Sequence, residues 1–399
     1  MTTTASTPAA GSPGPVSGPA STRLISLDVL RGVTIAFMIM VNNNGSNQAW
    51  PFMKHADWNG MTATDLVFPT FLFVVGASVV LAFEARLSRG ATRAALAWQT
   101  VRRAATLFLF GLIVNGFGMV LYTFPHIQWN SWRVYGVLQR IAICYLVVGL
   151  FYLWDRRWQS KVAVLIFALV TYWILMRWVP VPGLGVPGRD IPFLDKDANL
   201  VAWLDRHIFP GSMLYETTRD PEGLLSDLPA LGTALLGMLA GIWMRSKHTL
   251  QSKAAGLAGG AAACLAIGSL WAIWFPLNKK LWTSSYVLVA GGISMGLLAL
   301  FFWAIEVRGS RGKWTWPWLV LGSNSIAAYM ISELLGSVLD LIHLSHNGHR
   351  SGPLGWLFFN VFAKIPDGGL ASFTYSFTYL VICFIPVWIM YRKKIFLKV

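Results

Sequence analysis

The chain has 399 residues, of which 55% are hydrophobic and 12% charged, and its mean hydropathy is +0.55. This composition excludes a soluble globular protein, and the recurrence of apolar windows along the chain excludes a soluble domain with one anchor helix. The net charge of +15 would suit a nucleic-acid-binding protein, but the basic residues cluster in loops between apolar windows, so we expect a membrane protein and no nucleic-acid partner.

Residues 1–22 consist almost entirely of Pro, Ser, Thr, Ala and Gly. They have no basic segment followed by an apolar stretch and a small-residue cleavage site, as a secretory signal would. We therefore expect a disordered cytoplasmic tail at 1–22, followed by one transmembrane domain over residues 23–399.

A bilayer core about 30 Å thick is crossed by roughly 20 apolar residues in a helix. Windows of this length predict an all-α, polytopic bundle of about ten transmembrane helices. The predicted spans are 24–43, 65–86, 97–119, 133–153, 161–179, 228–245, 254–275, 282–304, 315–337 and 371–391. A shorter apolar patch at 354–363 could form an eleventh, re-entrant or interfacial piece.

Basic residues gather in alternate loops, after the second, fourth, sixth, eighth and tenth predicted spans. The positive-inside rule therefore predicts that these loops and both termini face the cytoplasm. The loop between the first two spans, which carries His55, then lies on the external face. Lys279 and Lys280 break the pattern, because they fall in an external loop where the insertion rule gives no reason for them.

The largest external segment runs from 180 to 227, and its first residues are rich in Pro and Gly, which predicts an irregular loop or lid. Within it, residues 199–209 (NLVAWLDRHIF) have the spacing of a short amphipathic helix. This helix would lie along the membrane surface or cap a cavity. A lid of purely structural value remains the alternative.

The segment KHADWNG (54–60) and the following TDLVFP (64–69) bring a histidine and a carboxylate to the start of a predicted span. Imidazole changes charge near neutral pH, and a nearby carboxylate can orient it, so His55 and Asp65 suit proton transfer at the membrane surface. The alternative is an interfacial loop that Trp58 anchors without chemistry.

Charged residues within membrane spans are costly, at roughly 2.5–3.5 kcal/mol each on insertion scales, so they often mark sites. Asp65, Arg140 and Glu333 all fall in the outer half of the predicted membrane, which predicts a polar pocket opening outward. Asp28 and Arg31 are three residues apart on the first span. They form either a structural ion pair or a basic group facing an anionic cofactor from the cytosol.

Other kinds of site have little support in the sequence. Asn347-Gly348 interrupts the histidine triplet at 343–349, and the three cysteines fall inside predicted spans without paired spacing, so we expect no metal. The chain also has no P-loop, no G-x-G-x-x-G and no G-x-S-x-G elbow, which argues against nucleotide hydrolysis and serine-hydrolase chemistry.

Several motifs occur in an order that is similar to one known family. They are LDVLRG, VNNN, KHADWNG and TDLVFPTFLFVVG near the start, then RVYGVLQRIAICY (133–145), LYETTRDPEGLLS (214–226), FPLNKKLWTSSYV (275–287) and LGSNSIAAYM (321–330). Together they resemble the heparan-alpha-glucosaminide N-acetyltransferase family of multi-span membrane enzymes.

The resemblance implies transfer of an acetyl group from cytosolic acetyl-CoA to the amine of a hexosamine on the far side of the membrane. Because the sequence starts almost at the family's catalytic core, we expect a bacterial form without the N-terminal luminal region. It would lie in the cytoplasmic (inner) membrane, with its active site opening to the periplasm.

The resemblance also implies site residues. His55 matches the family's catalytic histidine, and Asp65 and Asn42 match positions around it, although an extra residue before Trp50 leaves Asn43 and Asn44 as alternatives to Asn42. A protonated amine must lose a proton before it attacks a thioester, so His55 would act as the base, Asp65 would orient it and Asn42 would stabilise the oxyanion. Alternatively, His55 is the nucleophile and carries the acetyl group.

Further residues complete the predicted site. For the cofactor, acetyl-CoA, we expect contacts from Arg31, Arg140 and Asn324. For the amino-sugar or glycan acceptor we expect contacts from Trp58, Asn59, Glu222, Asn278, Lys279 and Glu333.

Two other functions fit the same features. An O-acyltransferase of a surface glycan or lipid would use the same base and donor, and only its acceptor would differ. A transporter or flippase would also explain charges within spans, but no repeat of KHADWNG or DPEG appears in the second half of the chain. The sequence leaves the acceptor and a homodimeric state open.

Overall fold

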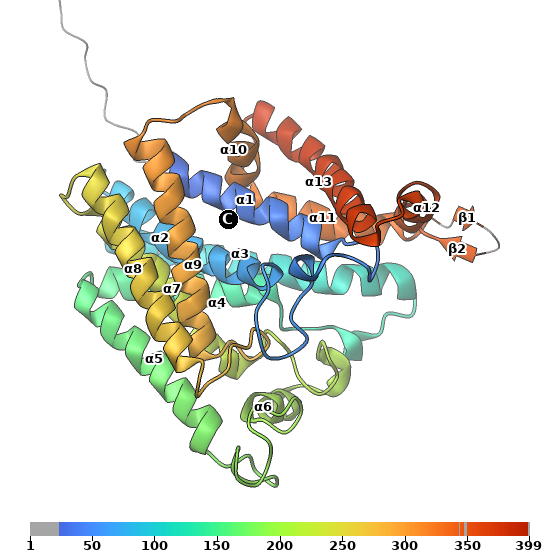
Figure 1. Cartoon of the computed structure of the whole chain (residues 1–399), viewed down its shortest axis with the longest axis horizontal. Coiled ribbons are helices and arrows are strands. Elements are labelled where there is room, and N and C mark those ends of the chain that lie inside the picture. The colour runs from blue at the N-terminus through green and yellow to red at the C-terminus, as the bar shows by residue number, and fades with distance from the viewer. Residues whose placement is uncertain (1–23, 343, 347–348, 398–399) are drawn as a thin grey trace, which may run out of the picture.

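The computed structural model describes residues 24–342, 344–346 and 349–397, so the tail expected at 1–22 lies outside the described residues. The protein is a bundle of helices with one short antiparallel hairpin (Figure 1). The helices are α1 (Ile25–Asn42), α2 (Val67–Leu87), α3 (Arg93–Thr123), α4 (Val137–Trp154), α5 (Trp158–Trp178), α6 (Leu200–Ile208), α7 (Asp227–Arg245), α8 (Leu250–Trp271), α9 (Ser284–Phe302), α10 (Trp316–Ser323), α11 (Ser325–Leu339), α12 (Pro353–Asn360) and α13 (Gly368–Arg392), and the hairpin strands are β1 (Leu344–His346) and β2 (His349–Ser351).

Within the described residues, nine helices are long and apolar enough to cross a membrane, and the bent pair of α10 and α11 adds a tenth if the two helices form one broken span. The predicted all-α, polytopic class is therefore confirmed, and the number of candidate spans reaches the predicted ten when the bent pair is counted as one span. The apolar patch at 354–363 contains α12, which has eight residues and a length of about 12 Å, too short to cross a bilayer.

The ninth span differs from the sequence-based prediction of one continuous helix. It breaks at Asn324, whose backbone leaves helical geometry, and α10 and α11 meet there at 72° (Figure 1). The Asn324 side chain donates to the Ile395 carbonyl oxygen at 3.0 Å and accepts from the Leu397 amide at 3.0 Å. Asparagine favours such side-chain bonds to backbone over helix continuation, so the break also fixes the chain after α13.

Two glycines allow α2 and α7 to pack backbone against backbone. A Cβ atom at Gly76 would lie 1.9 Å from the Ala234 carbonyl oxygen, and one at Gly237 would lie 1.8 Å from that of Phe73. Any larger residue would push the helices apart. Because α2 follows Asp65 and α7 begins at Asp227, this contact fixes the relative positions of two segments that carry acidic residues.

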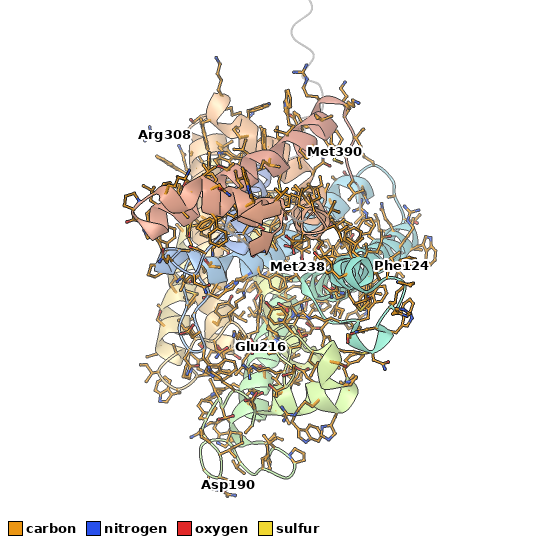
Figure 2. The ribbon with its side chains drawn as sticks, turned by 90° about the vertical axis from the view of Figure 1, so that its right-hand side faces the viewer. Phe124, Asp190, Glu216, Met238, Arg308 and Met390 are labelled. Carbon is orange, nitrogen blue, oxygen red and sulfur yellow. The ribbon has the colours of Figure 1, made fainter. Side chains whose placement is uncertain are left out.

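The segment between α5 and α7 contains α6, which confirms the short helix predicted at 199–209. Asn199 caps it, since its side-chain oxygen accepts from the Ala202 amide at 2.9 Å. The segment lies beyond the ends of α5 and α9, at the lower edge of Figure 1. Figure 2 shows Asp190 of this segment at the opposite end of the molecule from Arg308, with Glu216 between Met238 and Asp190.

Candidate functional site

His55 and Asp65 form a hydrogen-bonded pair, with 2.7 Å between His55 Nδ1 and Asp65 Oδ1. Asp65 lies in a 3₁₀ turn (Thr64–Leu66) that leads into α2, and its side chain is 1% exposed. Its other oxygen accepts from the backbone amides of Ala56 and Thr62, both at 3.0 Å. The carboxylate thus orders the loop and holds the ring through Nδ1. The His55 side chain is 45% exposed, and the carboxylate does not use its Nε2 atom.

Lys279 reaches this pair from the loop between α8 and α9. Its Nζ atom lies 3.2 Å from each ring nitrogen of His55 and 4.0 Å from Asp65 Oδ1. Burial lowers the pKa of the Lys279 ammonium, against the opposing effect of the negative charges of Glu222 and Asp65. The position of Lys279 supplies a reason for a basic residue that the positive-inside rule did not explain.

Asn278 and Asn59 attach the Lys279 loop to the His55 loop. The buried Asn278 side chain donates to Asn59 Oδ1 at 3.2 Å and accepts from the Leu281 amide at 2.9 Å. A backbone bond from the Gly60 amide to the Leu277 carbonyl oxygen, at 2.8 Å, adds to this contact. Both asparagines, predicted to bind substrate, thus hold the two loops in register.

Trp58 connects the His55 loop to the segment 180–227, which the sequence predicts to be external and which we call the external segment. Its indole N–H donates to the Leu194 carbonyl oxygen at 2.8 Å, and the Arg219 guanidinium lies 5.0 Å from the centre of its ring. The ring also packs with the apolar cluster beneath that segment, which includes Tyr172 and Phe275. Trp58 therefore fixes the position of the external segment relative to His55.

Arg140, predicted to contact the cofactor, is 1% exposed and lies in the core. Its Nε donates to Asp227 Oδ1 at 2.7 Å, and its guanidinium lies 5.1 Å from the ring centre of the buried Trp282. Asp227 is absent from the predicted site, although its place at the start of a predicted span was a signal. The pair holds α4 and α7 together.

Glu222 pairs with Arg133, a residue the sequence-based prediction also lacks. Arg133 binds both oxygens of Asp220, at 2.8 and 2.6 Å, and Glu222 Oε2 at 2.5 Å. The motifs RVYG and DPEG contain these residues, but they are about 90 positions apart, so their pairing has no local signal. The contact joins the entry to α4 with the end of the external segment.

The three candidate asparagines at the end of α1 have different partners. Asn42 donates to Glu333 Oε1 at 3.2 Å, which brings two predicted site residues together. Among the described residues, no hydrogen bond joins Asn42 to His55 or Asp65. Asn43 donates within α1, to the Ile39 carbonyl oxygen, and Asn44 donates to the Met53 carbonyl oxygen at 2.8 Å, two residues before His55.

A cavity of about 270 Å³ lies between α1, α2, α3, α4 and the bent α10–α11 pair. Arg31 and Arg103 line it together with mostly apolar side chains, and Arg31 donates to Ser78 Oγ at 2.6 Å and to Asp28 Oδ1 at 3.1 Å. Phe68, one turn after Asp65, is also on its wall. Arg140 and Asn324 do not line this cavity. A diphosphate needs cations and a pantetheine arm needs a narrow apolar passage, so the wall residues have the chemistry that the expected acetyl-CoA would require.

A family model described as heparan-alpha-glucosaminide N-acetyltransferase, catalytic, matches residues 23–275. The chain belongs to this family. Two relatives carry the same family name: the protein of Mus musculus is 30% identical over 366 residues, and that of Homo sapiens is 26% identical over 432 residues. The matches cover 78% and 94% of this family member, but 54% and 60% of the relatives, so the chain spans little more than half of their length.

Proposed function

We propose that this chain is a transmembrane N-acetyltransferase, which moves acetyl from cytosolic acetyl-CoA to the amine of a hexosamine on the external side. The His55–Asp65 pair carries the proposal, because acyl transfer to an amine needs a base held in one orientation. The family's name supports the reaction and the class of acceptor. The positive-inside pattern supports an inner membrane in which the site opens to the periplasm.

The cavity beside α2 supports the donor's path. Arg31 and Arg103 would attract the phosphates of acetyl-CoA, and the apolar wall would accept the pantetheine arm. Phe68 on that wall packs edge to face against Trp282, with 5.0 Å between ring centres, and Trp282 belongs to the loop that carries Lys279. The donor's passage would thus run toward the His55 loop.

Two carboxylates, Glu333 and Glu222, support the proposal that the acceptor is an amine. Glu333, held by Asn42, and Glu222, held by Arg133, offer negative charge to an ammonium group before it is deprotonated. We propose that these two residues hold the amino sugar. Trp58, Asn59 and Asn278 would act by keeping the loops in place.

Two routes remain for His55. In the first, Nε2 takes the proton of the acceptor amine, and Asp65 stabilises the resulting imidazolium through Nδ1–H. In the second, Nε2 carries the acetyl group between donor and acceptor. Protein incubated with labelled acetyl-CoA without acceptor, denatured near neutral pH and separated at once from free label, would identify the second route if it retains acetyl only when His55 is present.

The test is transfer of radiolabelled acetyl from acetyl-CoA to glucosamine by the purified protein in detergent. We expect labelled N-acetylglucosamine from the wild type and a loss of about 10²-fold or more in His55→Ala. His126→Ala, which changes an exposed histidine in the loop after α3, is the matched control and should retain activity.

Three outcomes would contradict parts of the proposal. Label on a hydroxyl group would replace N-transfer with O-transfer. Activity that survives in His55→Ala would remove His55 from the reaction. If the wild type transfers no label and acetyl-CoA does not raise its unfolding temperature, a transporter becomes the better explanation.

A further inference from the structure

We propose that Lys279 is a catalytic residue, whose ammonium group stabilises the oxyanion that forms on the acetyl carbonyl during transfer. This inference rests on the proposed acetyl transfer and deepens it. It changes the expected role of Lys279 from binding the acceptor to acting on the reacting atoms, and it transfers to Lys279 the part that the sequence suggested for Asn42.

The first support is the position of Nζ relative to the histidine ring. Nζ lies 3.2 Å from both ring nitrogens, but Nδ1 is already bonded to Asp65 at 2.7 Å, so its proton points to the carboxylate. The Asp65 oxygen is 4.0 Å from Nζ, beyond hydrogen-bond distance. The ammonium therefore lies within hydrogen-bond distance of Nε2, where the reacting atoms must come. An ammonium has three protons, so it can donate to an oxyanion that forms beside Nε2.

The second support is the rigidity of the Lys279 loop. The fully buried Asn278, just before Lys279, donates to Asn59 in the His55 loop. It also accepts from the amide of Leu281, two residues after Lys279. Trp282, also buried, has a φ of 55°, a left-handed conformation that is unfavourable for a large side chain and persists only where the surroundings impose it. A loop held this firmly fixes its lysine without further ordering during the reaction, as electrostatic catalysis requires.

The third support is the contrast with Lys280, the next residue. Lys280 points to the external segment and donates to Glu216 Oε1 at 2.7 Å, where both side chains are partly exposed. That ion pair accounts for Lys280. The ammonium of Lys279 has no carboxylate within hydrogen-bond distance among the described residues, and its side chain is 19% exposed.

The charges of the reaction match this arrangement. His55 Nε2 removes a proton from the acceptor's ammonium, and the neutral nitrogen then forms a bond to the acetyl carbon while the C=O π pair moves to oxygen. Lys279 donates a hydrogen bond to that oxyanion, and Asp65 balances the imidazolium. When the C=O bond re-forms, the C–S bond breaks and the His55 imidazolium gives its proton to the leaving sulfur, which forms the thiol of CoA. The freed Nε2 then takes the second proton of the new amide nitrogen and releases it to water. No other reactant is needed.

The decisive experiment separates oxyanion stabilisation from acceptor binding. Lys279→Met is compared with Lys280→Met and the wild type for transfer to glucosamine and for slow hydrolysis of acetyl-CoA without acceptor, because hydrolysis passes through an oxyanion but uses no amino sugar. We expect Lys279→Met to lower kcat for transfer about 10²–10³-fold and hydrolysis in parallel, with little change in the acceptor KM. Acetyl-CoA should raise the unfolding temperature of both variants as it does that of the wild type.

Two results would overturn the proposal: a higher acceptor KM with kcat and hydrolysis retained, or full activity in Lys279→Met. If Lys279→Met fails to fold, Lys279→Cys treated with bromoethylamine rebuilds a lysine-like ammonium, and activity should return after treatment but not before. An unchanged rate after treatment would also overturn the role. A wild type without transfer would instead overturn the proposed function and this role with it.

Discussion

Asn324 binds the backbone on both sides of Phe396, accepting from the Leu397 amide and donating to the Ile395 carbonyl oxygen. Leu397 also lines the cavity that contains Arg31 and Arg103. One side chain at the break between α10 and α11 therefore fixes the segment that follows α13 against the proposed donor passage.

Asn324→Ala should release this segment. Loss of two hydrogen bonds, at about 1 kcal/mol each, should lower the free energy of unfolding by about 2 kcal/mol and speed proteolysis of the last residues. The measurements are thermal unfolding in detergent and digestion followed by mass spectrometry. Asn360→Ala, which removes an exposed bond to the Trp356 carbonyl oxygen, is the control. Equal stability of both variants would contradict the role of Asn324.

Asp65→Asn should remove most activity. An amide oxygen can replace one carboxylate oxygen, but it cannot also accept the proton of His55 Nδ1 and hold the ring as a carboxylate does. We expect kcat for acetyl transfer to fall by about 10²–10⁴-fold, measured with labelled acetyl-CoA. Asp57→Asn, which changes an exposed carboxylate of the same loop, should leave kcat within about twofold. A similar loss of kcat in Asp65→Asn and Asp57→Asn would mean that any substitution in this loop lowers activity, and it would contradict a specific role for Asp65.

Arg133→Ala should destabilise the fold. It would leave the fully buried Asp220 carboxylate without its bidentate partner, which typically costs about 3–5 kcal/mol. Arg189→Ala removes another Arg–Asp contact, but the Arg189 side chain is 74% exposed, and such pairs contribute about 0–1 kcal/mol. The difference between their unfolding midpoints tests the assignment, and a difference near zero would show that Asp220 finds another partner.

Asp205 should make stability depend on pH. It is buried in α6, and burial raises its pKa to about 7 in the folded protein. Between about pH 4 and pH 7 the folded state therefore binds more protons than the unfolded state, so stability should fall as pH rises through this window and level off above it.

Asp205→Asn should remove this dependence, because an amide does not titrate. Above pH 7 the variant should be more stable than the wild type by at most about 4 kcal/mol, and the two should converge near pH 4. Unfolding midpoints from pH 4.5 to pH 8.5 provide the test. Parallel curves for the two proteins would place the pKa of Asp205 near its ordinary value.

The spans could be predicted from sequence because each depends on local composition alone. Hydropathy reports how many apolar residues follow one another, but not the direction in which the chain runs. The hydropathy profile therefore does not show the bend at Asn324, since α10 and α11 are both apolar. The polar residue at its centre was visible, but its partners, Ile395 and Leu397, lie more than 70 positions away.

The site was predictable to a similar degree. His55 and Asp65 are ten positions apart, and the start of a span placed them on the same membrane surface. Lys279 could be noticed in the sequence because it lies in a predicted external loop, contrary to the positive-inside rule. The partners Arg140 and Asp227, or Arg133 and Asp220, are each 87 positions apart, and a single sequence has no local pattern that links such distant residues.

The bond from Trp58 to the Leu194 carbonyl oxygen has a mechanical consequence. Trp58 is three residues from His55. Movement of the external segment away from the bundle would therefore displace the loop that orients the imidazole. Under the proposed function, movement of the segment that covers the site and the orientation of the base would thereby be linked.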